Sequence, residues 1–574
     1  MRYHKKRSEM KKNKLVIFFF LFFTTAMAFA ETSTNSTRSN YKDSPFGFHY
    51  ANNLSNYTGD LGIKWVRVNA VWDIIQKEKD IINGDYNWDA FENHTKLNSY
   101  PENINFIITI SILGTPVAGS GSYIPDDGVY TEESWIKYTK ALVNKYNDRV
   151  KYWQVENEPK PNMKDYAELQ KITYKAIKEE CSKCQVLMGG FLWARGSIKE
   201  FDKINNPILQ ELNGEYVDIY DQHYGGNAKD YNTKTFLDYI KKRLKEANFN
   251  ETPIWITEMS DYSGDPKEKM KLDPPYQSEQ VQAQSLFKRY VSSISYGVEK
   301  VFWAFGIIEG FHYDESYFDF TGLIYDGKYN YDMGYGVKKL AYYTYKLMVE
   351  KLEGSDWDNI QTIQESNNIY IYRFIKNGAP VWVAWNDDSS DKTISLDVGN
   401  INSAKVNSDK VTITTSIPDA ENGAQLTQKI TFKTKIKQII EERVFISLDA
   451  NPVYVEEGEV SSPVYEVEKF VGSNSDEKRR FPEHKRPFDE GDFRPILGKV
   501  TSLRGNTLVI ENRQRGLITV RINEQTRITT ERTKNKSLND INIGNVIATI
   551  PINKEVDSTN LTAAMIDILP KKKE

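Results

Sequence analysis

Two glutamates stand at the ends of strand-like segments, and these residues are the ones best suited to chemistry. Glu158 lies in Tyr-Trp-Gln-Val-Glu-Asn-Glu-Pro (152–159), where Pro159 cannot donate to a sheet and should end the strand. Glu258 ends a second apolar segment, Pro-Ile-Trp-Ile-Thr-Glu (253–258). A carboxylate at a strand end is poorly placed for packing and well placed for reaction. Two such carboxyls, one protonated and one ionised, are what cleavage of a glycosidic bond with retention requires.

The elements that must position these glutamates alternate between strand and helix. Eight apolar segments are predicted strands: 46–50, 65–69, 106–112, 152–157, 186–191, 217–224, 254–258 and 301–305. Segments with helical periodicity lie between or after them: 88–97, 132–146, 164–180, 198–212, 235–247, 278–296 and 335–352. This alternation over roughly 300 residues predicts an α/β fold, a (β/α)8 TIM barrel, whose active sites lie at the carboxyl ends of the strands.

A doubly wound open sheet is the structural alternative to the barrel. Such a sheet normally carries a glycine-rich phosphate loop after its first strand. The sequence Phe-Gly-Phe-His-Tyr-Ala (46–51) has no such loop, so the barrel is favoured. In that barrel Glu158 ends the fourth strand and Glu258 the seventh, and both carboxyls face the same mouth.

The chain beyond the predicted barrel (45–353) changes to β patterns. Short alternating segments, with a hairpin signal at Asn377-Gly378, predict an all-β sandwich-like domain over 354–455. Residues 456–495 are rich in charge and proline and predict a solvated linker. Five short strand segments then predict a small C-terminal β-barrel domain within 496–574. Neither β domain contains a cluster that suggests chemistry.

The N-terminus predicts export. A cluster of Lys and Arg precedes an apolar run that ends Ala-Phe-Ala (28–30), which is the pattern of a secretory signal peptide over residues 1–30. Cleavage after Ala30 would leave residues 31–44 as a flexible lead-in and place the protein outside the cytoplasm, as a secreted, periplasmic or cell-surface protein. An uncleaved membrane anchor is the alternative, although the run is short for a span of about 20 residues.

Composition limits the partners. The net charge of −4 over 574 residues gives no reason to expect nucleic acid or an anionic membrane, and it does not indicate an oligomeric state. The two cysteines, Cys181 and Cys184, are too few for a zinc site, so we predict no metal and no cofactor. An exported chain favours a local disulfide between them, and two free thiols at a helix end stay open as the alternative.

Residues 46–352 resemble the clan A glycoside hydrolases. The signature of that clan is Asn-Glu-Pro at the end of the fourth strand and a second Glu at the end of the seventh. The stretches Gly-Ile-Lys-Trp-Val-Arg-Val-Asn-Ala-Val-Trp-Asp-Ile-Ile-Gln (62–76) and Gly-Asp-Tyr-Asn-Trp-Asp (84–89) are similar to the family 39 type and to relatives in families 5 and 42. The resemblance implies that Glu158 is the general acid/base and Glu258 the nucleophile.

The resemblance also implies substrate-binding roles for five other residues. Asn157 would hydrogen-bond the sugar 2-hydroxyl, and Arg67 would hold the nucleophile ionised. His223 and Tyr224 end the sixth strand, and one of them would contact the nucleophile. Trp303, at the eighth strand, would form the floor under the bound sugar. Each has a structural alternative: a structural ion pair for Arg67, a buried histidine for His223 and a core position for Trp303.

Four residues are harder to assign. Trp72, Trp193 and Phe305 are weaker candidates for sugar platforms. Glu156 stands where such enzymes often carry an apolar or aromatic residue, and it receives no role from the sequence.

The sequence therefore predicts a secreted retaining glycosidase that cleaves O-glycosidic bonds, expected to be β-linked, in oligosaccharides or polysaccharides. A transglycosylase would use the same residues with a sugar as acceptor. A non-catalytic carbohydrate-binding or cell-surface protein is the alternative from another class.

Overall fold

The structure, a computed structural model, describes most of the chain after the N-terminal segment. The described residues are 44–49, 54–120, 123–159, 162–193, 198–225, 233–266, 276–312, 316–328, 333–399, 408–426, 429–467, 496–512, 516–523, 526–530, 534–551 and 560–568. The predicted signal peptide, nearly all of the lead-in and most of the predicted linker lie outside these ranges.

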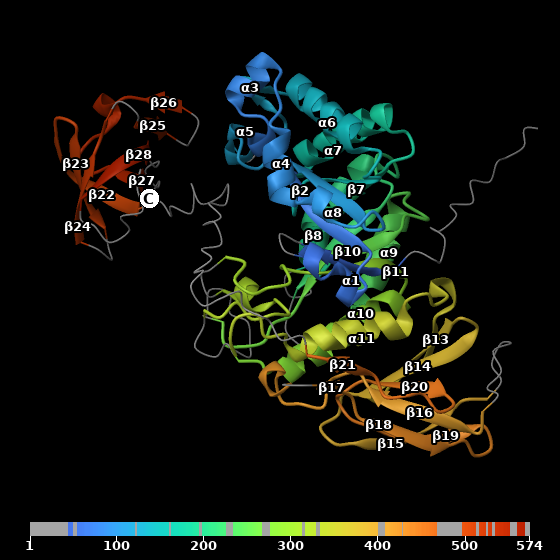
Figure 1. Cartoon of the computed structure of the whole chain (residues 1–574). Coiled ribbons are helices and arrows are strands. Elements are labelled where there is room, and N and C mark those ends of the chain that lie inside the picture. Colours follow the sequence, from blue (N-terminus) through green and yellow to red (C-terminus); the bar gives the residue numbers. More distant parts are fainter. Residues whose placement is uncertain are drawn as a thin grey trace, which may run out of the picture. The chain divides into compact units, whose positions relative to one another are not determined.

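A parallel sheet forms the centre of the first domain (Figure 1). Its strands are β1 (Phe46–His49), β2 (Trp65–Val71), β3 (Asn105–Ser111), β6 (Tyr152–Val155), β7 (Gln185–Met188), β8 (Phe191–Trp193), β9 (Tyr220–Gly225), β10 (Ile254–Ser260) and β11 (Val298–Trp303). The order is β7-β6-β3-β2-β1-β11-β10-β9-β8. Only Gly189 and Gly190 separate β7 from β8, so the two are halves of one strand and the sheet closes as an eight-position barrel. The barrel prediction is confirmed.

Helices follow the strands as the periodicity predicts. The longer ones are α4 (Trp88–Thr95), α6 (Glu132–Tyr146), α7 (Met163–Glu180), α8 (Ile198–Leu212), α9 (Lys234–Glu246), α10 (Glu279–Ser295) and α11 (Leu340–Leu352). Four of them begin at side-chain caps, because Asn87, Thr131, Asn162 and Ser278 each accept a backbone N–H from the first turn. Among the helices that the structure describes, none combines the length and the apolar character that crossing a bilayer requires.

The barrel interior is layered by the alternation of side chains along each strand. An apolar layer at the amino-terminal side contains Trp65, Ile107, Leu187, Ile219, Trp255 and Phe302, with Tyr152 packed against it. Two positions farther along their strands lie buried polar residues, which we call the polar layer: Arg67, Thr109, Gln154, Asp221 and Thr257. Because successive inward positions are two residues apart, the polar layer lies directly above the apolar one and below the mouth.

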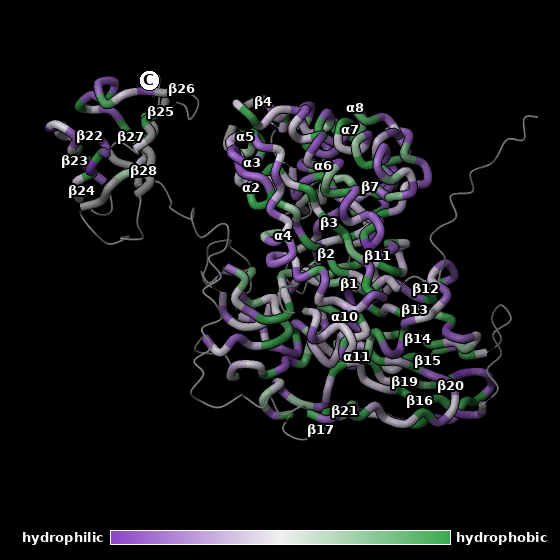
Figure 2. Tube along the Cα trace, turned by 45° about the horizontal axis from the view of Figure 1, so that its top comes forward, coloured by the Kyte–Doolittle hydropathy of each residue, from purple (hydrophilic) through white to green (hydrophobic). Residues whose placement is uncertain are grey.

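A β domain follows the barrel (yellow to orange in Figure 1). Its main sheet has the order β12-β13-β14-β20-β16-β18, from β12 (Gln361–Ser366), β13 (Ile369–Lys376), β14 (Ala379–Asn386), β20 (Val453–Glu457), β16 (Lys410–Thr415) and β18 (Thr434–Gln438). Two further pairs are β15 (Lys392–Asp397) with β19 (Arg443–Leu448), and β17 (Lys429–Thr431) with β21 (Val464–Glu466). Buried and exposed residues alternate along β19, and Figure 2 shows hydrophobic and hydrophilic residues intermixed in this domain. The sandwich-like prediction is confirmed.

Two details of the β domain concern its predicted turn and boundary. Asn377 and Gly378 both have positive φ, 52° and 80°, between β13 and β14, so the predicted hairpin is present. The strands β20 and β21 run to residues 457 and 466, past the predicted boundary at 455. The acidic composition of this segment predicted a linker, but β20 is a strand that pairs with β14 on one side and with β16 on the other.

The barrel and the β domain share one hydrophobic core. The rings of Phe287 on α10 and Tyr454 on β20 lie 5.5 Å apart. The Glu279 carboxylate, at the start of α10, accepts the backbone N–H of Gly423 at 2.9 Å. Helix α10 of the barrel therefore packs on the β domain rather than on solvent.

The C-terminal segment forms a small β barrel of its own. Strands β24 (Gly516–Arg521), β23 (Thr507–Asn512), β22 (Ile496–Arg504), β27 (Val546–Pro551) and β28 (Asn560–Ile568) are neighbours in that order, and β28 pairs back with β24. A short pair, β25 (Arg527–Thr530) and β26 (Lys534–Lys536), extends the sheet beside β28. These five closing strands are the five that the sequence predicts.

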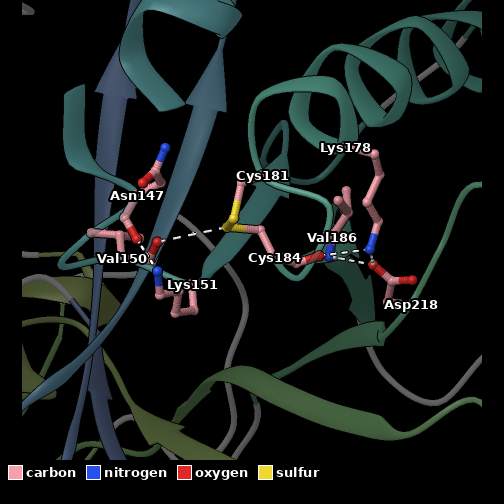
Figure 3. The surroundings of a disulfide bond; sticks show 8 residues. All are labelled: Asn147, Val150, Lys151, Lys178, Cys181, Cys184, Val186 and Asp218. Carbon is pink, nitrogen blue, oxygen red and sulfur yellow. Dashed lines mark hydrogen bonds and ion pairs between the residues drawn. A yellow bond between two sulfur atoms is a disulfide. The ribbon is translucent and has the colours of Figure 1, made fainter. Parts of the chain in front are cut away.

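Cys181 and Cys184 form a disulfide at the end of α7 (Figure 3). Nearby, Lys178 forms an ion pair with Asp218 at 2.7 Å and donates to the Cys184 carbonyl at 2.6 Å. Of the two alternatives that the sequence leaves open, the structure has the disulfide.

Candidate active site

Glu158 and Glu258 come together at the carboxyl ends of the barrel strands. Glu158 follows β6, Glu258 lies on β10, and His223 on β9 stands with them. One side-chain oxygen or nitrogen from each of the three lies within 4.8 Å of the other two. The Glu158 side chain is 18% exposed and the Glu258 side chain only 7%, so Glu158 has more contact with solvent.

A bulge in β10 aims Glu258 into the barrel. Trp255 belongs to the apolar layer, so strict alternation would turn Thr257 inward and Glu258 outward. The register of β10 shifts between Trp255 and Glu258 against β9, and between Ile256 and Met259 against β11. A bulge of this kind re-aims one side chain, and here both Thr257 and Glu258 face the interior.

An irregular turn positions Glu158. Glu156 and Glu158 both have positive φ, 64° and 45°, a backbone conformation that is uncommon for residues other than glycine. The strand ends before them, as Pro159 predicts. The turn sends the three side chains apart: Glu156 contacts Ser111, Asn157 contacts Arg67 and Glu158 contacts His223.

Arg67 is the buried cation of the site. Its Nη1 donates to Glu258 Oε1 at 2.6 Å, and its Nη2 donates to Asn157 Oδ1 at 2.6 Å. Its Nε donates to Gln154 Oε1 at 2.7 Å. A guanidinium with fixed donors holds the Glu258 carboxylate in one orientation through a charge-assisted bond, and it places Asn157 beside that carboxylate.

His223 lies between the two glutamates. Its Nδ1 is 3.0 Å from Glu158 Oε1 and 3.4 Å from Glu258 Oε2. Burial by itself would lower the pKa of His223, but the carboxylates of Glu258, Asp221 and Glu158 outweigh burial and raise it to about 10. His223 is therefore an imidazolium at neutral pH.

The surroundings of Glu258 shift its pKa in both directions. Burial raises the pKa of the Glu258 carboxyl and the nearby Glu158 adds to this, while His223 and Arg67 oppose the rise. His49, on β1, also lies 3.4 Å from Glu258 Oε1. Burial, Arg67 and His223 hold the pKa of His49 well below its usual value, so His49 is neutral. Sequence reasoning missed His49, although it is the one titratable residue of the first strand.

Glu156, which received no role from the sequence, anchors the end of β3. Its carboxyl accepts the Ile112 N–H at 2.5 Å and the Ser111 hydroxyl at 3.0 Å. Burial raises the pKa of Glu156 to about 7, although these bonds act in the opposite direction. The residue thus ties the third strand to the turn that carries Glu158.

The stability of the protein should depend on the protonation of Glu156. Its pKa in the folded chain is about 7 against an ordinary 4.5, so the folded state holds this proton more tightly than the unfolded state. The contribution is complete below pH 4.5 and is lost as the pH rises to 7, which lowers the free energy of unfolding by about 3 kcal/mol. We expect the free energy of unfolding of Glu156→Gln, measured with denaturant at several pH values, to show no such decrease between pH 4.5 and 7. The exposed control Glu251→Gln should show the same decrease as wild type. An equal pH dependence of the free energy of unfolding in wild type and Glu156→Gln would contradict this role of Glu156.

Gly190 makes room for His223. A Cβ at this position would lie 2.0 Å from His223 Nε2 and 2.5 Å from Asp221 Oδ2. The break between β7 and β8 therefore contains a residue that must lack a side chain.

Replacing Gly190 with alanine should displace the His223 ring. Since a misplacement of about 1 Å can reduce turnover about 100-fold, we expect a loss of at least that order, measured on folded protein checked by circular dichroism. Gly59→Ala is the matched control, because a Cβ there would meet nothing within 4 Å. Full activity of Gly190→Ala would show that the ring adapts.

Two of the predicted substrate-binding residues stand apart from this cluster. The structure does not bring Tyr224 into it, because the Tyr224 ring lies under the Arg289 guanidinium of α10, 5.2 Å away, on the outer side of the sheet. Trp303 has no exposed surface, and its Nε1 donates to the Thr321 carbonyl at 2.9 Å. Its role as a sugar floor stays a prediction.

The weaker aromatic candidates differ in exposure. Trp72 is fully buried among Trp135 and Tyr138, so it is a core residue. The side chain of Trp193 lies outside the described residues. Phe305 is half-buried, with its ring centroid 6.0 Å from that of His49, and it continues into a partly exposed aromatic group with Phe311 and Phe318.

Glu158, His223 and Glu258 are also the one group among the described residues whose side chains could hold a metal ion. The donor set fits a cation poorly. His223 with a pKa of about 10 is protonated and offers no lone pair, and the Arg67 guanidinium already contacts Glu258.

Solved structures that resemble this chain include glycoside hydrolases. A family 39 glycoside hydrolase from the gut symbiont Bacteroides cellulosilyticus is 15% identical, with a TM-score of 0.52 over 72% of this chain and 81% of that one. Weaker likenesses are a glucosidase from Croceicoccus marinus (11%, TM-score 0.47, 72% and 96%) and an α-L-arabinofuranosidase from Thermotoga maritima (12%, TM-score 0.45, 72% and 89%). No family model and no curated protein matches the sequence. The first likeness shows that the chain has the fold of a family 39 glycoside hydrolase.

Proposed function

We propose that the protein is a retaining glycoside hydrolase, a clan A enzyme related to family 39, with Glu158 as general acid/base and Glu258 as nucleophile. The observation that carries the proposal is the approach of the two carboxyls to within 4.8 Å. Retaining glycosidases separate their carboxyls by about 5–5.5 Å, whereas inverting ones leave about 6.5–9.5 Å for a water molecule.

The reaction would proceed in two displacements. Glu258 attacks the anomeric carbon while Glu158 donates its proton to the glycosidic oxygen, so the bond to the leaving group breaks and a glycosyl ester forms. Glu158 then takes a proton from water, the water attacks the anomeric carbon, and Glu258 is released. The more buried Glu258, held by Arg67, suits attack on carbon, and the more exposed Glu158 suits proton exchange with the leaving group and water.

Other residues support binding of a sugar. Asn157 is exposed beside Arg67, where its amide could hydrogen-bond the 2-hydroxyl. The aromatic group of Phe305, Phe311 and Phe318 offers apolar faces close to His49, as a sugar-binding wall requires. The proposed substrate is a β-linked oligosaccharide or polysaccharide, and the predicted signal peptide implies that the protein meets it outside the cytoplasm.

The stereochemistry of the product tests the proposal. The purified protein would be screened on aryl β-glycosides and on plant and bacterial polysaccharides, and the hydrolysis of the best substrate would be followed by proton NMR from the first turnovers. We expect the β anomer to form first and the α anomer to appear only by mutarotation, whose rate a sample of the free sugar provides. An α anomer as first product would overturn the retaining mechanism.

A further inference from the structure

A buried carboxylate and a hydroxyl lie behind His223, on the side away from the glutamates. Asp221 on β9 and Thr257 on β10 are both fully buried members of the polar layer. The His223 Nε2 lies 3.2 Å from Thr257 Oγ1 and 3.3 Å from Asp221 Oδ2. Sequence reasoning gave neither residue a role.

The donors around Asp221 fix where hydrogens must lie. The Thr257 hydroxyl donates to Asp221 Oδ2 at 2.5 Å, and the Thr257 backbone N–H donates to Asp221 Oδ1 at 3.0 Å. With its hydrogen directed at Asp221, the Thr257 oxygen has only lone pairs to offer His223. Since both neighbours of Nε2 are acceptors, Nε2 carries a hydrogen.

The other ring nitrogen then has a defined relation to Glu158. With Nε2 protonated, a 3.0 Å contact between Nδ1 and Glu158 Oε1 requires one hydrogen between them, on either atom. We propose that Asp221, acting with Thr257, is a positioning residue that locks this form of His223 and thereby holds one shared proton between His223 and Glu158. This deepens the proposed function, on which it rests, because the shared proton is the one that Glu158 delivers to the leaving oxygen.

The surroundings of His223 contain further charges that bear on this proton. The titratable and charged groups that face it are Asp221 on its own strand, Glu258 on β10, Glu158 after β6, His49 on β1 and Arg67 on β2. Asp221 is the one anion among them on the Nε2 side. Removing its charge should therefore weaken proton retention without touching the glutamates.

Gln154 connects Asp221, which lies behind His223, to Arg67, which contacts Glu258. Its Nε2 donates to Asp221 Oδ2 and its Oε1 accepts from Arg67 Nε at 2.7 Å. One neutral amide thus joins the anion behind His223 to the cation that holds Glu258, and fixes both.

Nitrogen NMR of the histidines tests the proposal independently of activity. In 15N-labelled full-length protein, the His223 signals would be assigned by their absence in His223→Asn and titrated between pH 5 and 11. We expect Nε2 to stay protonated throughout in wild type and the titration midpoint to fall by about one pH unit or more in Asp221→Asn. Thr257→Val should lower the His223 midpoint by a smaller amount, whereas Thr257→Ser, which keeps the hydroxyl, should have the wild-type midpoint.

Kinetics test whether the shared proton serves the reaction. In Asp221→Asn the alkaline limb of the kcat/KM profile should move to lower pH together with the His223 midpoint, and kcat/KM at neutral pH should fall about 10- to 100-fold. Asp218→Asn is the matched control, because this carboxylate pairs with Lys178 near the start of the same strand and should leave both readings unchanged.

The outcomes separate the two proposals. An unchanged His223 midpoint in both Asp221→Asn and Thr257→Val would overturn the positioning role. A shifted midpoint with an unshifted kcat/KM profile would overturn its link to catalysis. A shifted midpoint in a protein that hydrolyses no glycoside would support the positioning of His223 by Asp221 and Thr257 and would contradict the proposed function.

Discussion

Glu258→Ala should abolish turnover, because the residue supplies the atom that bonds to the anomeric carbon. Loss of a catalytic nucleophile reduces kcat by roughly 10⁵-fold or more. The cavity left by the side chain can admit a small anion, so azide should restore reaction of an activated aryl β-glycoside and yield a glycosyl azide of inverted configuration. Steady-state kinetics and NMR of the azide product provide the measurement.

Two companion variants make the Glu258 result specific. Glu258→Gln keeps the shape and the contact with Arg67 but cannot attack carbon, so it should be as inactive as the alanine variant. Glu251→Ala removes an exposed glutamate shortly before the same strand and should be fully active. Wild-type activity in Glu258→Gln would sink the double-displacement mechanism.

Glu158→Ala should have an effect that depends on the leaving group. General acid catalysis contributes about 10²–10⁴-fold, and it is needed most when the departing alcohol is a poor leaving group. We expect a loss of that order in kcat/KM for unactivated glycosides and little loss for a dinitrophenyl glycoside. Azide should accelerate the second step and give a product of retained configuration, because Glu258 is still present.

The dependence on leaving-group pKa is the discriminating measurement for Glu158. A series of aryl glycosides should give a steep slope of log kcat/KM in Glu158→Ala and a shallow one in wild type. Glu156→Gln, which alters a carboxyl two residues away, should keep the shallow slope. Equal losses over the whole series would assign Glu158 to structure rather than to proton donation.

Periodicity and strand-end residues predicted the architecture well, because they report burial along one element at a time. The helices α6 and α8 begin and end where the sequence places them, and all eight barrel strands are present. What escaped depends on pairing between elements. Strand β20 contains acidic residues, and their composition predicted a linker. Pairing with β14 and β16 on both sides makes the segment a strand, so the predicted domain boundary at 455 fell inside it.

The site shows the same division. Glu158, Glu258, Arg67, Asn157 and His223 lie together, as strand-end motifs suggested, but the bulge that turns Glu258 inward leaves no mark in the sequence. Alternation alone could have indicated Gln154 and Asp221, which lie two positions beyond inward apolar residues. The separation of His223 from Tyr224 follows from the same rule. Gly190 could not be singled out, because its importance is the space that His223 occupies.

The shared core of barrel and β domain decides which part of this protein can exist alone. Phe287 and Tyr454 are both fully buried against each other, and the start of α10 uses Gly423 to complete the bonds of Glu279. A chain ended at residue 353 would leave this apolar surface in water and should aggregate. The smallest autonomous enzyme therefore reaches at least Glu466, where β21 ends, and the β domain cannot be exchanged as an independent module.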